Sequence, residues 1–122
     1  MVTDTKATMT ADQVSEFALG HPEAIEDHPF GPALDVFKVG GKVFGLLTED
    51  RVSLKCDPKE SLRLRDEYPA ITAGYHLNKR HWNTVELDGS VPEEEVRWMV
   101  RHSYELVVGN LSKEDRVRLQ GS

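Results

Sequence analysis

Hydrophobic residues recur along the chain at two spacings, and each spacing predicts one type of element. Residues 34–39, 42–48 and 51–56 are strand-length runs rich in Val, Leu and Phe. Gly40-Gly41 separates the first two runs and can supply the positive φ angles of a tight hairpin turn. In the third run apolar and polar residues alternate, so we expect Val52, Leu54 and Cys56 in the core and Ser53 in solvent. The pattern predicts an antiparallel meander.

Spacings of three and four residues predict helices elsewhere. Thr10 and Gln13 form a capping-box pattern before a short helix that ends near Gly20. Pro58 suits the first turn of a helix through about residue 67, with Leu62 as its expected core contact. A capping box at residues 90–93 opens the longest helix, residues 92–109. Its apolar stripe consists of Val96, Met99, Val100, Ser103 and Val107.

The remaining segments complete a single predicted domain. Residues 71–77 and 81–87 resemble two strands joined by a turn at residues 78–80. Residues 21–33 hold three prolines without periodicity, which favours a loop, and Ser112 can cap a last short helical turn. We expect a flexible tail over residues 1–9 and one domain over 10–120. The predicted fold class is α+β, an antiparallel sheet of about five strands with helices packed on one face.

Charge is distributed unevenly along an acidic chain. The 122 residues carry a formal charge of −6, yet residues 38–82 hold nine Lys and Arg against six Asp and Glu. A local cationic patch is therefore compatible with an acidic protein. The chain has no signal-peptide pattern, no apolar run of the roughly 18 to 20 residues that span a bilayer, and a single cysteine. We expect a cytoplasmic protein that does not bind membranes.

The segment 76–84 combines imidazoles, cations, carboxamides and an indole in nine residues. Such a composition favours a surface for nucleic acid or another anionic ligand, because phosphates attract cations and bases stack on flat rings. The same residues also suit an ordinary solvated turn, and the aromatic residues Phe30, Tyr75 and Trp82 also suit a core or its rim. Two cationic hairpin turns together define the candidate nucleic-acid site, whose residues are Lys38, Lys42, Asn78, Lys79, Arg80 and His81.

Other chemistries find less support in the sequence. His76, His81 and His102 are the candidates for a metal or acid–base role, but no carboxylate accompanies them at a recognisable ligand spacing. The three glutamates at 93–95 suit a helix N-terminus without a metal. Cys56 and Ser103 lie in core patterns and lack a neighbouring base. We therefore expect no catalytic residues, no metal site and no cofactor, and hence no enzyme.

Five segments of the chain resemble the signature blocks of the MmcQ/YjbR family of small bacterial proteins. They are residues 28–31 (HPFG), 37–44 (FKVGGKVF), 54–58 (LKCDP), 76–82 (HLNKRHW) and 103–107 (SYELV). The resemblance implies a fold like that of the CyaY/frataxin-like group and hairpins arranged as a double-wing DNA-binding motif. A moderate cationic patch predicts that any DNA binding is weak and salt-dependent, and the absence of a catalytic pattern predicts a non-catalytic protein.

The alternative to DNA binding is a small cytoplasmic protein-interaction or regulatory module. A monomer or a weak homodimer is expected.

Overall fold

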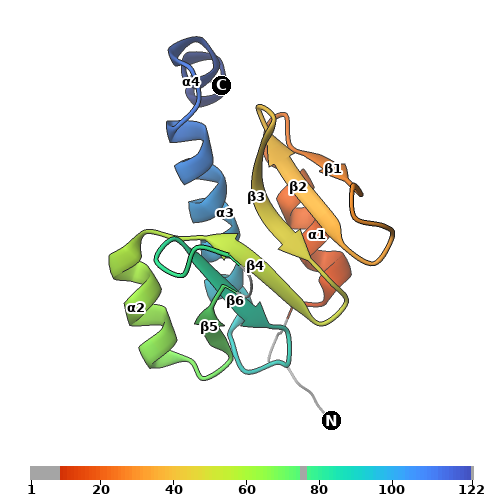
Figure 1. Ribbon diagram of the computed structural model, residues 1–122, viewed down its shortest axis with the longest axis vertical. Helices are drawn as coiled ribbons and strands as arrows, with labels where there is room; N and C mark the ends of the chain where they lie inside the picture. The colour runs from red at the N-terminus through yellow and green to blue at the C-terminus, as the bar shows by residue number, and fades with distance from the viewer. Residues whose placement is uncertain (1–8, 75–76, 122) are drawn as a thin grey trace.

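Six antiparallel strands form one sheet, in the order β1-β2-β3-β4-β6-β5, in a computed structural model that describes residues 9–74 and 77–121 (Figure 1). The strands are β1 (Ile25–Asp27), β2 (Asp35–Val39), β3 (Lys42–Leu47), β4 (Arg51–Lys55), β5 (Ile71–Ala73) and β6 (Trp82–Glu86). The helices are α1 (Ala11–Leu19), α2 (Pro58–Glu67), α3 (Glu93–Gly109) and α4 (Lys113–Gln120). The predicted α+β class is confirmed.

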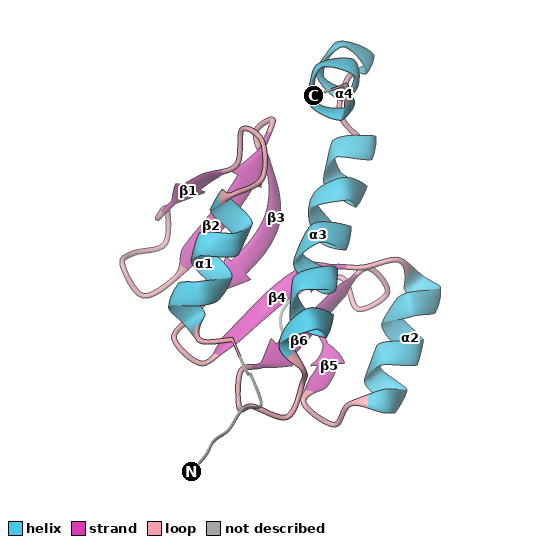
Figure 2. Ribbon diagram, turned by 180° about the vertical axis from the view of Figure 1, so that it is seen from behind, coloured by secondary structure: helices cyan, strands magenta, loops and turns pink. Residues whose placement is uncertain are grey.

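The core lies between the sheet and the helices that cover one of its faces. Viewed from behind, α1 and α3 lie in front of the strands, and α2 lies at the side of the sheet next to β5 (Figure 2). The whole predicted stripe of α3 is buried, and α3 packs mainly on β3 and β4. Phe37 and Phe44 are fully buried on the sheet side of this layer. Burial of this apolar surface is the main contribution to the stability of the fold.

Strand β1 is the element that the sequence pattern did not predict. Residues 21–33 lack periodicity, but Ile25–Asp27 pairs antiparallel with β2, with Glu26 opposite Phe37. The sheet therefore has six strands rather than about five. A three-residue edge strand is too short to show an alternating pattern, and its backbone pairing with β2 fixes it.

Two predictions about burial are wrong, one for Leu62 on α2 and one for Ser53 on β4. Leu62 of α2 is 66% exposed, while Ser61 and Leu64 of the same helix are buried. Ser53 is buried, because its hydroxyl forms a hydrogen bond of 2.8 Å with the hydroxyl of Thr84 on the neighbouring strand β6. A cross-strand hydroxyl pair satisfies both polar groups, so a polar residue can be covered on this face.

Several predicted ends of elements also shift. Strand β5 ends at Ala73, short of residue 77, and the predicted capping box of α3 is absent because Ser90 bonds to Asp88 instead. Met9, assigned to the tail, is buried in the core. Thr10 and Gln13 do form the capping box of α1, and Ser112 caps a full helix, α4.

The two predicted hairpins are held in different ways. Gly40 and Gly41 have φ values of 58° and 80°, as the tight turn between β2 and β3 requires. A Cβ atom on Gly40 would lie 2.7 Å from Leu111, so the turn packs closely on the connection between α3 and α4. The second connection, residues 74–81, begins where the Gly74 amide donates to the Trp82 carbonyl at 2.8 Å.

Within the described residues, every helix is too short or too polar to cross a bilayer.

Truncation of Val100 tests the position of the core. Val100 is fully buried on α3, so Val100→Ala should lower the free energy of unfolding by about 1–3 kcal/mol through lost burial and a residual cavity. Leu62→Ala is the matched control, and it should cost less than about 0.5 kcal/mol because Leu62 is exposed. Urea denaturation of both variants measures the difference. Equal losses would contradict the packing of α3 described above.

Candidate nucleic-acid interface

The two predicted cationic turns lie at the same end of the sheet. The strand registers place Gly45 opposite Leu54 and Lys55 opposite Trp82. The start of β3, the end of β4 and the start of β6 therefore coincide, and the turns that precede β3 and β6 project from this end. Figure 1 shows them apart, with the β2–β3 turn near α4 and the β5–β6 connection beside α2. The structure therefore places the two cationic turns at one end of the sheet without bringing them next to each other.

The first turn offers one free cation rather than two. Lys38 forms an ion pair of 3.1 Å with Asp27 on β1, so its charge is largely compensated. Lys42 lies opposite Val39 in the strand register, so these two side chains point to the same face of the sheet. Because adjacent residues of a strand point to opposite faces, Lys38 points to the other face. Lys42 is exposed, and the ion pairs of the described residues involve other cations. Lys38 is therefore a poor candidate for phosphate contact.

The second turn is shaped by Asn78. Its side-chain oxygen accepts hydrogen bonds from the backbone amides of Arg80 at 2.9 Å and His81 at 3.3 Å. A side chain that closes its own turn in this way fixes the local backbone. The side-chain carbonyl of Asn78 is thus used inside the turn, which leaves its amide nitrogen for outside contacts. Lys79 and Arg80 are exposed.

Arg65 of α2 anchors this turn, a role that the sequence pattern did not show. Its Nε donates to Asn83 Oδ1 at 2.7 Å, and its terminal nitrogen donates to the Lys79 carbonyl. Ser61 donates to the same Asn83 oxygen at 2.9 Å. Arg65 lies four residues after Ser61 and so on the same side of α2, which was the available signal. The guanidinium therefore connects α2, β6 and the turn.

Two hollows border the turn and share Pro58. One, of about 450 Å³, lies between the turn, the start of α2 and the end of α3, and is lined by Lys55, Cys56, Asp57, Pro58, Asn78, His81, Trp82, Leu106 and Asn110. The other, of about 380 Å³, is lined by Pro58, Lys59, Ser61, Leu62, Arg65, Lys79 and Arg80. We call the combined lining the loop surface.

The loop surface is strongly cationic for a chain with a net charge of −6. Five of its residues are Lys or Arg, and Asp57 is its one carboxylate among the described residues. Asp57 also accepts the Lys59 backbone amide at 2.9 Å as the N-cap of α2. Half-buried Trp82 supplies a flat apolar ring in the first hollow. Cations beside an indole suit an anionic ligand that carries aromatic groups.

Two of the three predicted histidines, His81 and His102, lie within the described residues. His81 is exposed on the turn, whereas His102 stacks on Trp98 with ring centroids 4.5 Å apart and accepts the Asp57 backbone amide at 3.2 Å. His76 and Tyr75 lie outside the described residues. Phe30, expected in the core or its rim, is instead 76% exposed.

The two candidate nucleophiles, Cys56 and Ser103, are each held by burial or hydrogen bonds within the fold. Burial raises the pKa of the Cys56 thiol to about 11, which keeps it protonated. The Ser103 hydroxyl donates to the Phe44 carbonyl at 2.6 Å and accepts the Lys55 amide at 2.9 Å, so it is fully used within the fold.

Comparison with known proteins agrees with the blocks noted in the sequence. The family model described as YjbR matches residues 19–106. The chain belongs to the YjbR family. It is 44% identical to YbdF of Escherichia coli O157:H7 over 96 residues, which cover 75% of this chain and 79% of YbdF. It is 33% identical to YjbR of Escherichia coli K12 over 113 residues, which cover 88% and 95% of the two chains.

Two solved structures share the fold of this YjbR-family chain. The crystal structure of Deinococcus radiodurans protein DR2400, a DUF419 domain, has a TM-score of 0.83 and 37% identity, covering 97% of this chain and 92% of DR2400. A crystal structure from Pseudomonas syringae has a TM-score of 0.72 and 28% identity, covering 80% and 98%. The names of these relatives state no ligand or activity, so the comparisons establish the family and the fold.

Protonation of His102 provides a test of the packing beside the loop surface. Burial lowers the pKa of His102 from its ordinary value of 6.5, and a doubly protonated ring could not accept the Asp57 amide. The unfolded chain therefore binds this proton more readily than the folded one. The stability that depends on the neutral ring is present above about pH 6.5 and is lost as the pH falls below it. NMR titration should show His102 titrating below 6.5, and His102→Gln should flatten the pH dependence of unfolding. Titration at or above 6.5 would contradict this packing.

Proposed function

We propose that this YjbR-family protein is non-catalytic and binds DNA through the phosphate backbone, with the loop surface as its main contact. The observation that carries the proposal is the concentration of five Lys and Arg residues against one carboxylate on the loop surface of an acidic protein. Lys79 and Arg80 are exposed on the ordered turn, and Lys42 projects from the same end of the sheet. Fixed cations on an ordered turn suit contacts to phosphates.

The surface supports weak and salt-sensitive binding. Arg65 is occupied by hydrogen bonds within the protein, which leaves Lys42, Lys55, Lys59, Lys79 and Arg80 for phosphates. At about −0.9 per phosphate neutralised, the slope of log affinity against log salt should be no steeper than about −4.5. The negative charge over the rest of the chain opposes binding outside this surface. Trp82 lies beside the cations, where an unpaired base could stack on it.

A double substitution tests the proposal. Lys79→Ala with Arg80→Ala should reduce the magnitude of the salt slope by up to about 1.8, because two phosphate contacts are lost. The melting temperature should hardly change, since exposed cations contribute little to folding. Fluorescence anisotropy of a labelled duplex at several salt concentrations gives the slopes.

The matched control removes the same charge elsewhere. Arg101→Ala with Lys113→Ala also deletes two exposed cations, on α3 and α4, outside the loop surface. This variant should keep the wild-type slope. Absence of wild-type binding at low salt, or equal slopes for the two double variants, would reject DNA binding through this surface.

The second candidate function is a protein-interaction module, and exposed Leu62 favours it. This leucine is 66% exposed at the edge of the second hollow, between Lys59 and Arg65. Large apolar side chains of this kind form the centre of many interfaces. If the surface binds a second copy of the chain, sedimentation should show a concentration-dependent dimer that Leu62→Glu abolishes. A monomer at all concentrations for both proteins would remove self-association.

A further inference from the structure

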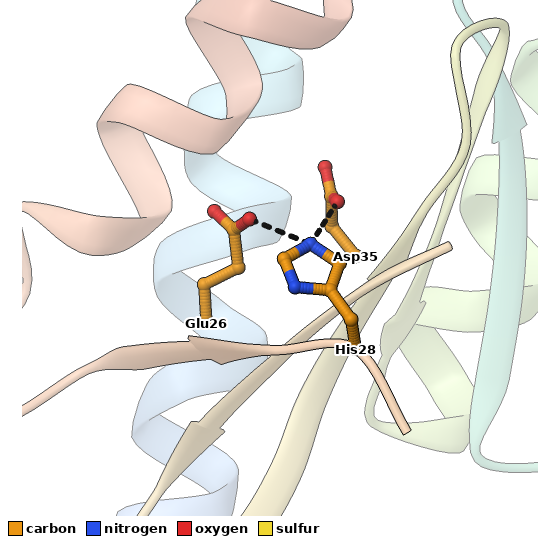
Figure 3. A group of neighbouring side chains, drawn as sticks. All are labelled: Glu26, His28 and Asp35. Carbon is orange, nitrogen blue, oxygen red and sulfur yellow. Dashed lines mark hydrogen bonds and ion pairs between the residues drawn. The ribbon is translucent and has the colours of Figure 1, made fainter. Parts of the chain in front are cut away.

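Glu26, His28 and Asp35 converge on one point at the edge of the sheet (Figure 3). The His28 Nε2 atom lies 2.9 Å from Glu26 Oε2 and 2.8 Å from Asp35 Oδ1. The three ligand atoms all lie within 4.8 Å of one another. The side chains are partly exposed, so an ion could reach them from solvent.

The fold assembles this group from two strands. Glu26 lies on edge strand β1 and His28 two residues later, so both side chains leave the same side of the chain. The connection after His28 returns to Asp35, the first residue of β2. The Ser15 hydroxyl of α1 donates to the other Glu26 oxygen at 3.4 Å, which orients that carboxylate toward the helix-covered face.

The surroundings of the three residues are rich in carboxylates. Glu26 and Asp35 line a hollow of about 400 Å³, together with the carboxylate residues Asp12 and Glu49. Among the described residues, this lining contains four carboxylates and no Lys or Arg. The nearest cation along β2, Lys38, is paired with Asp27, which leaves the strand on the side opposite to Glu26. The hollow therefore attracts cations.

We propose that Glu26, His28 and Asp35 bind one divalent transition-metal ion of the Zn²⁺ class, a site independent of the loop surface. In tetrahedral coordination, bonds of about 2.0–2.2 Å from a common metal place neighbouring ligand atoms roughly 3.3–3.6 Å apart. The observed separations of 2.9 and 2.8 Å from the imidazole nitrogen are shorter, so the two carboxylates would move slightly away from the ring to admit the ion. One imidazole and two carboxylates suit Zn²⁺, Mn²⁺ or Fe²⁺ better than Mg²⁺, which binds imidazole poorly. Water would complete the coordination.

The competing account is a simple ion pair, in which a proton on Nε2 bonds to both carboxylates. The same three atoms can surround either a proton or a metal ion, so their positions fit both the ion pair and the metal site. An exposed pair of this kind contributes little to stability and predicts no affinity for Zn²⁺ beyond that of other surface carboxylates. Only the metal-binding account predicts that these three residues bind one ion per protein molecule.

Calorimetric titration with Zn²⁺ measures the site. Wild type should bind one ion, and His28→Asn, Glu26→Gln and Asp35→Asn should each weaken that binding at least about tenfold. The matched control is Glu105→Gln, which neutralises one exposed carboxylate on α3 and should keep the wild-type affinity. Mg²⁺ should bind more weakly than Zn²⁺. Triad variants that bind Zn²⁺ as tightly as wild type would overturn the proposal.

A second measurement on the wild type does not depend on variants that fold. Substoichiometric Mn²⁺ should broaden NMR signals around residues 12–15, 26–28, 35 and 49, and leave those of residues 78–82 sharp. Zn²⁺ should also raise the melting temperature of wild type, and of Glu105→Gln, but not of the triad variants, because an ion that binds only the folded state stabilises it. Broadening centred elsewhere would overturn the site whatever the outcome for DNA.

Discussion

The contact between α3 and the middle of the sheet determines where every other element lies. The ladder between β3 and β4 reaches Gly45 and Leu54, and the Ser103 hydroxyl then bridges the next two backbone groups, the Phe44 carbonyl and the Lys55 amide. A hydroxyl inserted between two strands satisfies both backbone groups while the strands separate. Figure 1 shows β3 diverging from β4 at this end, with α3 behind them. The two hairpin turns are consequently held apart.

This separation changes the basis of the proposed DNA contact. Two wings that share one surface would need Lys38 and Lys42 on the same side as the second turn. Instead Lys38 is paired with Asp27, and α2 brings Lys59 and Arg65 next to Lys79 and Arg80. The cationic surface is thus assembled from a helix and a turn. Arg65 contributes order rather than available charge, because its donors are occupied within the protein.

Positively and negatively charged side chains also gather at different places along the sheet. The loop surface lies where β4 ends, whereas Glu26, His28 and Asp35 lie where β2 begins, at the opposite end of β2 from the Gly40–Gly41 turn. An anion and a cation would therefore be attracted to different ends of one domain. Glu26, His28, Asp35 and all of the loop surface except Asn110 fall within residues 19–106, the part of the chain that matches the YjbR family model.

The sequence by itself determined the elements with a strong local signal. These are the stripe of α3, the Gly40-Gly41 turn and the Thr10–Gln13 capping box, which depend on residue spacing and backbone geometry and are therefore local properties. Tertiary structure alone decided the rest. Strand β1 exists because β2 offers it a pairing edge, Leu62 is exposed because α2 turns Leu64 inward, and Lys38 is neutralised by a residue eleven positions away. Pairing, helix rotation and charge compensation depend on neighbours in space, which no local pattern records.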